Sequence, residues 1–290
     1  MKPFVSVIIP TYHDWERLKM CLTALRAQTY PQGRFEVIVV NNDHQDPVPE
    51  MELPNNFQIL SESKPGSYAA RNKGISVAIG EVFAFTDSDC IPQKDWIEKA
   101  VVRLLDGAER IAGHVELFFQ SGKLTPVEIF EKAFEFPQER YARTGGSVTA
   151  NMFTWSRHFQ KVGLFNESMR SGGDNEWGWR ALALGIPITF SPDVVVKHPA
   201  RSTMAELIKK RERVVGGLEF ISSTTKKDPP FWLIRGFLPP IHSLILLSGR
   251  KDLSFHEKVV AFSIKYYLKI FSTIQKIRIR LGKISRNKNK

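Results

Sequence analysis

Two aspartates separated by one serine follow a run of apolar residues. Asp87-Ser88-Asp89 comes after residues 82–85, a run typical of a buried strand. A tight turn at a strand end can aim both carboxylates at one point, and a hard divalent cation bound to a diphosphate prefers such oxygen ligands. A turn held by Asx-type backbone hydrogen bonds would have the same sequence. The position after a hydrophobic strand favours the metal site.

A second pair of carboxylates, Asp174 and Glu176, stands between two glycines and two tryptophans. A carboxylate beside apolar rings can act as a general base, because partial desolvation raises its pKa. The alternative is an acidic helix start with core tryptophans such as Trp177. For Glu176 the alternative is an ion pair with Arg180, four residues later.

Two further segments carry candidate ligands for anions or metals. Residues 66–74 place small residues and Arg71 at the start of a predicted helix, where free backbone N–H groups favour anions. The segment lacks Walker A and GxGxxG spacing, and an exposed arginine on a helix is the alternative. His198 follows a predicted strand and precedes Arg201, which would suit metal or phosphate contact, although most lone histidines are structural.

Alternating strands and helices must position these groups. Residues 4–9, 35–40, 57–60 and 82–85 read as strands. They are separated by a helix over 67–79 and by a helix that the Asp14 side chain can cap, whose helically spaced apolar positions are Leu18, Cys21, Leu22 and Leu25. This alternation predicts an α/β protein with a mostly parallel sheet. Ligands bind beyond the carboxyl ends of such strands. The polar clusters after the first, second and fourth strands are therefore expected on one rim.

In this order, the segments resemble the family 2 glycosyltransferases, enzymes with the Rossmann-like GT-A fold. The resemblance covers roughly residues 4–201, and the order and spacing of the motifs together are specific. The segments that carry it are Val7-Ile8-Ile9-Pro10-Thr11-Tyr12, residues 37–43, Ala70-Arg71-Asn72-Lys73-Gly74, Asp87-Ser88-Asp89, Gly163-Leu164-Phe165-Asn166-Glu167, and Gly173-Asp174-Asn175-Glu176 with Arg180.

The resemblance implies a set of donor-binding residues. In this family Thr11 and Tyr12 would cradle the nucleotide base, and Asn151 would lie against the donor sugar and diphosphate. Asn41 stands where the family often has an aspartate, so a UDP-, GDP- or dTDP-linked donor stays open. The implied donor-binding residues are Pro10, Thr11, Tyr12, Asn41, Arg71, Asp87, Asn151 and Arg201.

The resemblance also implies the catalytic groups. Asp89 would be the main ligand of Mg²⁺ or Mn²⁺, and His198 would complete the metal site. Asp174 matches the general base of an inverting reaction. Gly173 takes a place where many members have glutamate, which shifts the paired acid to Glu176. Trp177, the next residue, is expected to support the acceptor.

The predicted function is therefore metal-assisted transfer of a sugar from a nucleotide sugar to a glycan or lipid-linked acceptor, as in polysaccharide biosynthesis. A nucleotidyltransferase of related fold is an alternative, but its Gly-rich triphosphate loop is missing near the N-terminus. A nucleic-acid-binding protein is suggested only by the net charge of +11.

The distribution of charge argues against nucleic acid as a partner. Residues 1–200 hold 21 Lys/Arg and 24 Asp/Glu, a net charge of −3, whereas residues 201–290 hold 20 and 6, a net charge of +14. The sequence therefore predicts a catalytic domain over residues 1–201 and a basic helical extension over residues 202–290. The two cysteines, Cys21 and Cys90, form no metal-binding pattern, and their sparse use fits a reducing compartment.

The extension is expected to contact an anionic membrane surface. Residues 231–247 are apolar but divided by Arg235 and Pro239-Pro240 into pieces too short to cross a bilayer, and an interfacial segment is expected there. Residues 255–281 carry an apolar helical stripe, and lysines beside it could reach anionic headgroups: Lys258, Lys265, Lys269, Lys276 and Lys283. A helix packed on the body is the alternative. No export signal is expected at the N-terminus, so the predicted location is cytoplasmic, peripheral at the inner face of the membrane.

Overall fold

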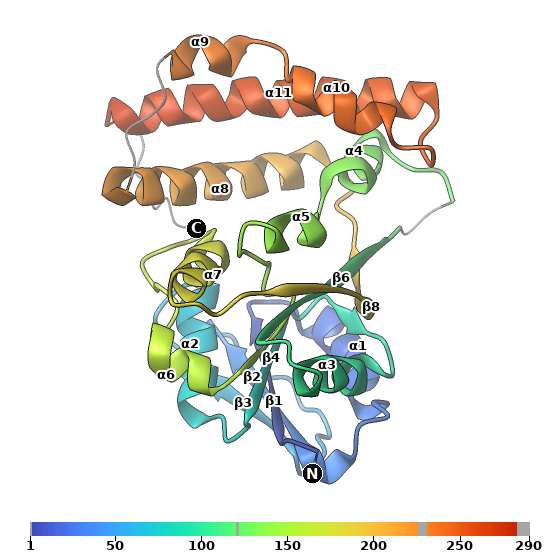
Figure 1. Ribbon diagram of the computed structural model, residues 1–290, viewed down its shortest axis with the longest axis vertical. Coiled ribbons are helices and arrows are strands. Elements are labelled where there is room, and N and C mark those ends of the chain that lie inside the picture. The colour runs from blue at the N-terminus through green and yellow to red at the C-terminus, as the bar shows by residue number, and fades with distance from the viewer. Residues whose placement is uncertain (1, 120–121, 226–230, 283–290) are drawn as a thin grey trace. The chain divides into compact units, whose positions relative to one another are not determined.

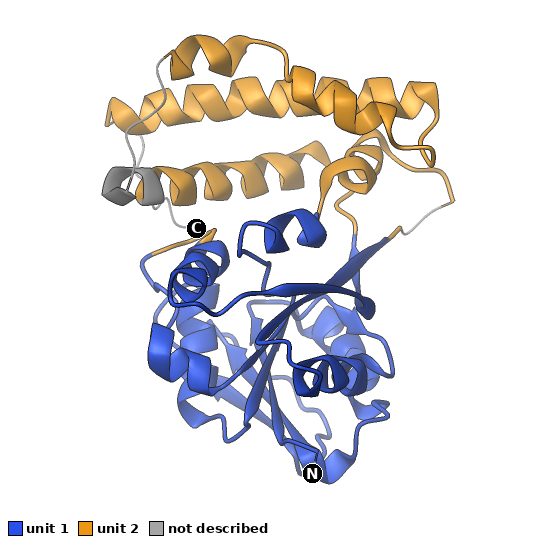
Figure 2. Ribbon diagram, in the orientation of Figure 1, with its two compact units in different colours: residues 1–117, 136–168, 173–199 blue, residues 118–135, 169–172, 200–290 orange. Residues whose placement is uncertain are grey.

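The computed structural model describes residues 2–119, 122–225 and 231–282, with only the backbone of residues 221–225 (Figure 1). The chain forms two compact units (Figure 2). Unit 1 contains Met1–Leu117, Phe136–Ser168 and Gly173–Pro199, and unit 2 contains Phe118–Glu135, Met169–Gly172 and Ala200–Lys290. The break at residue 199 lies close to the expected boundary, but two short segments of the expected catalytic domain belong to unit 2.

An eight-stranded sheet forms the centre of unit 1, in the order β3-β2-β1-β4-β7-β6-β8-β5. The strands β3, β2, β1 and β4 pair in parallel, whereas β4–β7, β6–β7 and β5–β8 pair antiparallel. The predicted α/β class is confirmed, and the sheet is mixed. The strands are β1 Val5–Thr11, β2 Phe35–Asn41, β3 Phe57–Ser61, β4 Val82–Thr86, β5 Ile91–Pro92, β6 Arg110–Phe118, β7 Asn151–Trp155 and β8 Thr189–Pro199.

Helices cover both faces of the parallel half of the sheet, which explains why its inner strands are apolar on both faces. Val5, Val7 and Ile9 of β1 share a core cluster with α1 and α3. On the other face, α2 approaches so closely that a Cβ on Gly74 would lie 2.6 Å from Ile8 Cγ2. The helices of unit 1 are α1 Trp15–Arg26, α2 Ser67–Val77, α3 Trp96–Leu105, α5 Gln138–Ala142, α6 Arg157–Val162 and α7 Gly173–Ala183, with a 3-10 turn η1 over Gln32–Arg34.

The helical spacing expected after Asp14 is confirmed, because the predicted apolar positions of α1 are all buried. The expected side-chain cap is wrong. Asp14 precedes the helix, but its carboxylate makes no capping hydrogen bond. Instead it pairs with Arg17 Nε at 2.7 Å and accepts a hydrogen bond from Ser88 Oγ at 3.3 Å. Asp14 therefore links α1 to the Asp87-Ser88-Asp89 turn.

Unit 2 is helical. The long helix α11 packs against α4, α8, α9 and α10. Capping boxes start both α4, at Thr125 and Glu128, and α11, at Ser254 and Glu257. Within the described residues, no helix combines the length and the hydropathy needed to cross a bilayer. The helices are α4 Pro126–Phe134, α8 Met204–Thr225, α9 Trp232–Phe237, α10 Ile241–Ser248 and α11 Phe255–Arg280.

Three of the lysines expected to face headgroups are engaged inside unit 2. Lys265 Nζ lies 4.5 Å from the Phe134 ring centroid. Lys269 Nζ donates to the backbone carbonyl of Leu238 at 2.8 Å, and Lys276 pairs with Glu219 at 3.1 Å. Lys283 lies outside the described residues. These contacts favour the alternative of a packed helix for α11.

Candidate active site

The loops after β1, β2 and β4 are tied to one another, as the sequence predicted for the rim of the sheet. The Asn42 N–H donates to the Thr11 carbonyl at 2.9 Å. His13, in the loop after β1, lies 3.0 Å from Asp43 and 3.2 Å from Asp46 in the loop after β2. The Ser88 contact with Asp14 joins the third loop. The polar residues that follow the three strands therefore form one surface.

Arg71 reaches this surface from α2. Its side chain is 4% exposed and donates from Nη2 to Asp87 Oδ1 at 2.5 Å. The centroid of the Tyr68 ring lies 5.7 Å from the guanidinium carbon. Within the described residues the buried Nε has no hydrogen-bond partner, and the same is true of Thr11 Oγ1. A buried donor without a partner is costly, so these atoms indicate a site built to meet a ligand.

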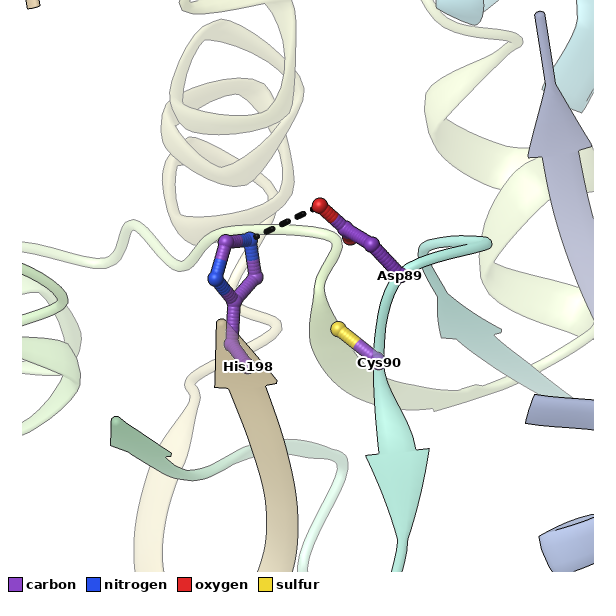
Figure 3. A group of neighbouring side chains, drawn as sticks. All are labelled: Asp89, Cys90 and His198. Atoms are coloured by element: carbon purple, nitrogen blue, oxygen red, sulfur yellow. Dashed lines mark ion pairs between the residues drawn. The ribbon is translucent and has the colours of Figure 1, made fainter. Parts of the chain in front are cut away.

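Asp89, Cys90 and His198 come together at the junction of the β4 loop and β8 (Figure 3). His198 Nε2 faces Asp89 Oδ2 at 3.5 Å, and Nδ1 lies 2.7 Å from the Pro199 carbonyl oxygen. That carbonyl can only accept, so it holds the ring proton on Nδ1 and leaves Nε2 available for a metal. The expected metal ligands are therefore neighbours in the structure.

Burial raises the pKa of the Asp89 carboxyl, while the charges of His198 and Arg17 oppose this effect. Arg17 Nη1 lies 3.6 Å from the same Asp89 oxygen. Burial also holds the pKa of the Cys90 thiol well above its usual range. The Asp89 carboxylate and the His198 imidazole form a set that fits a divalent cation sharing its other positions with phosphate oxygens and water.

Asp174 lies at the start of α7 and is 8% exposed. Burial raises the pKa of its carboxyl. Its oxygens accept hydrogen bonds from the backbone N–H of Asn175 at 2.9 Å, from the Tyr68 hydroxyl at 3.2 Å and from the backbone N–H of Thr149 at 3.4 Å. These donors orient a carboxylate that is partly desolvated, which is the environment of a general base.

Gly173 leaves room for the Tyr68 ring. A Cβ on Gly173 would lie 2.8 Å from Cε2 of that ring. The sequence has glycine where the resemblance would place glutamate, and the structure supplies the reason: Tyr68 occupies the space and donates to Asp174. Tyr68 was missed from the sequence because this contact joins residues 106 positions apart, and no local pattern signals it.

Glu176 and Trp177 have the structural roles that the sequence left open as alternatives, an ion pair with Arg180 and a position in the core. Glu176 pairs with Arg180 at 2.8 and 3.1 Å, and Arg180 also donates to the carbonyls of Val162 and Leu164. Trp177 is fully buried, stacks on Phe159 at 4.4 Å between ring centroids and donates from Nε1 to the carbonyl at position 163. Both residues therefore connect α7, the helix of Asp174, to α6 and to the residues that follow it.

Three of the expected donor-binding residues have other partners. Asn151 is fully buried: its Nδ2 donates to the carbonyls of His114 and Val194, and its Oδ1 accepts from Trp96 Nε1. These three partners occupy the polar atoms of the side chain, and the expected contact of Asn151 with the donor stays a prediction. The Asn41 amide donates to the carbonyls at positions 43 and 46 and so braces the loop after β2. Arg201 belongs to unit 2, where it pairs with the fully buried Glu131 at 3.0 Å.

The other expected donor-binding residues lie at the end of β1. Pro10 is buried inside the sheet and Thr11 is 2% exposed. Tyr12 is 62% exposed, and its ring meets the ring of His13 edge to face at 4.3 Å between centroids. An aromatic face held next to an unpartnered hydroxyl suits a nucleotide base.

Comparison with known proteins shows what this chain is similar to. The sequence profile described as "Glycosyl transferase family 2" matches residues 6–162. Glycosyltransferase AglE of Haloferax volcanii is 37% identical over 257 residues, which cover 83% of this chain and 84% of that protein. The dolichyl N-acetyl-alpha-D-glucosaminyl phosphate 3-beta-D-2,3-diacetamido-2,3-dideoxy-beta-D-glucuronosyltransferase of Methanococcus voltae is 22% identical over 225 residues, 71% of this chain and 70% of that protein.

A solved structure shares the fold. The mannosyltransferase PcManGT from Pyrobaculum calidifontis, in complex with GDP-Man and Mn²⁺, superposes with a TM-score of 0.62 at 16% sequence identity. The match covers 98% of this chain and 89% of that chain. At this level of identity the likeness shows a common architecture and does not by itself assign roles to the residues of the site.

Proposed function

Because the chain belongs to glycosyl transferase family 2 and has the GT-A fold, we propose that it is an inverting transferase in which Asp174 is the general base. The proposal rests mainly on one observation. The site holds two carboxylate centres with unlike neighbours: Asp89 stands among charged groups, whereas Asp174 is held by neutral donors. The first centre suits binding of a charged donor, and the second suits proton transfer.

The donor in this proposal is a nucleoside-diphosphate sugar. Tyr12 offers its exposed ring to the base, and nearby Thr11 Oγ1 and Arg71 Nε are buried atoms that have no hydrogen-bond partner among the described residues. Asp87 is already oriented by Arg71, which suits a contact with the ribose hydroxyls. The base itself is left open among UDP-, GDP- and dTDP-linked donors.

Asp89 and His198 would hold Mn²⁺ or Mg²⁺. When bound, the cation supplies positive charge that stabilises the diphosphate leaving group. His198 keeps Nε2 available because Pro199 fixes the proton on Nδ1. We expect Mn²⁺ to support activity better than Mg²⁺, since Mg²⁺ strongly prefers oxygen ligands.

Asp174 performs the proton transfer in the proposed reaction. The acceptor hydroxyl oxygen forms a bond to the anomeric carbon while the bond from that carbon to the diphosphate oxygen breaks. The hydroxyl proton passes to Asp174, which must therefore be ionised before the reaction. The hydrogen bond from Tyr68 stabilises this ionised form and fixes its direction. Attack from the face opposite the diphosphate inverts the anomeric configuration.

We further propose that the acceptor is a glycan or a lipid-linked sugar, handled at the inner face of the cell membrane. The Methanococcus voltae relative is named for a dolichyl-linked sugar phosphate, a lipid-linked acceptor. The short apolar helices α9 and α10 of unit 2 support a location at a bilayer.

A thermal-shift screen tests the proposal. Wild-type protein is melted with UDP-, GDP- and dTDP-sugars in Mn²⁺ or in EDTA, because a donor that binds the folded state raises the melting temperature by mass action. We expect one nucleotide class to raise it in Mn²⁺ only, and the Asp89→Asn variant to lose that response. No shift with any donor in Mn²⁺ would overturn the donor assignment. Nuclear magnetic resonance of the product of the matching donor then reports the anomeric configuration, and retention would overturn the inverting mechanism.

A further inference from the structure

The outer faces of α9 and α10 in unit 2 consist of large apolar side chains. Ile234, Ile241 and Ile245 are 60%, 67% and 65% exposed. A helix with an outward apolar face cannot be explained by packing within its own unit. The exposed apolar side chains of this surface, here called the α9–α10 surface, are Phe231, Leu233, Ile234, Phe237, Leu238, Ile241, Leu244, Ile245 and Leu246.

The inner faces of the two helices are fixed, so the outer side chains cannot turn inward. In α10, Ser243 and Leu247 are buried, one helical turn apart. In α9, a Cβ on Gly236 would lie 2.5 Å from the Thr273 side chain of α11, so the two helices are in close contact. The Trp232 ring packs under cationic groups of α11, with Lys276 Nζ at 4.7 Å from its centroid.

The polar backbone groups at the turn between the helices are satisfied from inside unit 2. The Phe237 carbonyl accepts a hydrogen bond from the Tyr266 hydroxyl at 2.7 Å, and the Leu238 carbonyl accepts one from Lys269 Nζ at 2.8 Å. Pro239 and Pro240, which follow, have no N–H to satisfy. Both carbonyl groups accept hydrogen bonds, and the two prolines carry no N–H group. The turn can therefore enter an apolar medium without the free-energy cost of unpaired polar groups.

The charge of residues 231–251 indicates which kind of apolar medium the α9–α10 surface would enter. Residues 231–251 contain no aspartate or glutamate, and Arg235 and Lys251 are exposed. The α9–α10 surface is therefore apolar with cations beside it, which complements an anionic bilayer. The helices span six and eight residues, too short to cross the hydrocarbon core, so they would lie in the plane of the interface.

We propose that the α9–α10 surface is the membrane-binding surface of this protein, entering the headgroup region of an anionic bilayer while α11 supports it from behind. The inference rests on the proposed function in that a lipid-linked acceptor requires the enzyme at a bilayer. Of the two segments expected from the sequence to meet the membrane, it favours residues 231–247: the lysines of α11 hold the unit together, and the isoleucines and leucines of α9 and α10 enter the lipid.

Co-sedimentation of the full chain with vesicles tests this surface without donor or acceptor. The test variant is Ile241→Glu/Ile245→Glu, and the matched control is Ile79→Glu/Leu105→Glu, which places the same two charges on exposed apolar positions of unit 1. With phosphatidylcholine vesicles containing phosphatidylglycerol, we expect the test variant to bind at least about tenfold more weakly than wild type, and the control to bind like wild type. Equal binding by the test variant and wild type would overturn the proposal.

A second measurement reports directly whether the α9–α10 surface enters the lipid. An environment-sensitive dye on an Ile241→Cys variant should shift to the blue on addition of the anionic vesicles, and the same dye on Ile79→Cys should not. Absence of the shift at position 241 would overturn the proposal. So would a dimer in sedimentation velocity that the Glu variant dissociates while vesicle binding stays unchanged, because the surface would then bind a second copy. Donor binding is read separately by thermal shift, so its failure would not affect this result.

Discussion

The two carboxylate regions at the rim of the unit 1 sheet have different neighbours. Asp87 and Asp89 lie among cationic groups: Arg71 contacts the first, and Arg17 and His198 approach the second. Asp174 is held instead by a hydroxyl and two backbone N–H groups. Burial raises the pKa of both Asp89 and Asp174. The charges of His198 and Arg17 oppose the shift at Asp89. At Asp174 the backbone hydrogen bond from Asn175 opposes it most, followed by the charge of Arg71 and the hydrogen bonds from Thr149 and Tyr68.

In the proposed mechanism this difference separates binding from proton transfer. Cationic neighbours and an imidazole create a place where a diphosphate and a metal can bind together. A carboxylate held by dipoles keeps its position when it gains or loses a proton, because no ion pair has to break. In this proposal aspartate takes two roles that depend on the residues around it, and each of the following variants removes one element of the contrast.

The largest effect is expected from Asp174→Asn. The amide retains the shape of the side chain but cannot accept the acceptor proton, so turnover should fall roughly 10²- to 10⁴-fold while donor affinity stays near wild type. Steady-state kinetics with the matching donor measure the fall. An active Asp174→Asn enzyme would show that Asp174 is not the general base.

Metal dependence is expected to show the next effect. EDTA should abolish activity, and Mn²⁺ should restore it in wild type. His198→Gln removes the imidazole nitrogen, so about 10- to 100-fold more Mn²⁺ should be needed for half-maximal activity. A titration of activity with Mn²⁺ measures this, with His256→Gln as a control at an exposed position of α11 in unit 2. Full activity in chelator would contradict a metal at Asp89 and His198.

Tyr68→Phe should shift the pH dependence of turnover. Tyr68 donates to Asp174, a bond that stabilises the ionised base and lowers its pKa. Without it the pKa of Asp174 rises further, and activity, which requires the ionised form, appears at higher pH. The acidic limb of the kcat profile should move upward in pH, with a loss of about tenfold or less at neutral pH. A limb that stays in place would show that Tyr68 does not act through Asp174.

The smallest effect is expected from Glu176→Gln. Glu176 pairs with Arg180 behind the helix, and both side chains are partly exposed, so the loss should be about 1 kcal/mol of stability or less. Turnover should stay within about threefold of wild type. Urea unfolding and steady-state kinetics measure the two effects. A loss of turnover as large as that of Asp174→Asn, with normal stability, would make Glu176 part of the catalytic machinery.

Local sequence patterns predicted the parallel half of the sheet and the residues at its strand ends, because burial on both faces of β1 and β2 leaves an uninterrupted apolar run. They did not predict the pairing in the antiparallel half, where β7 pairs with β4 and β6 across long stretches of chain. Asn151 shows the limit most clearly. The motif order suggested a donor contact, but the three partners of its amide come from α3, β6 and β8.

The site was predicted best where a residue acts alone and least well where it needs a distant partner. Asp89 and His198 followed from their places at strand ends, and their proximity is confirmed. Tyr68 could not be found, because its role depends on the space left by Gly173 in another helix. In unit 2 the helical period of α11 was predicted, but the sequence could not show which of its faces α4 and α8 cover.

Calorimetric titration of the matching donor into two variants, with turnover measured on the same samples, tests the division of roles most directly. We predict that Asp174→Asn binds donor and Mn²⁺ like wild type and turns over at least about 100-fold more slowly, whereas Asp89→Asn loses the Mn²⁺-dependent part of donor binding. The division of roles would be contradicted if Asp174→Asn lost donor affinity while Asp89→Asn kept both its affinity and its response to Mn²⁺.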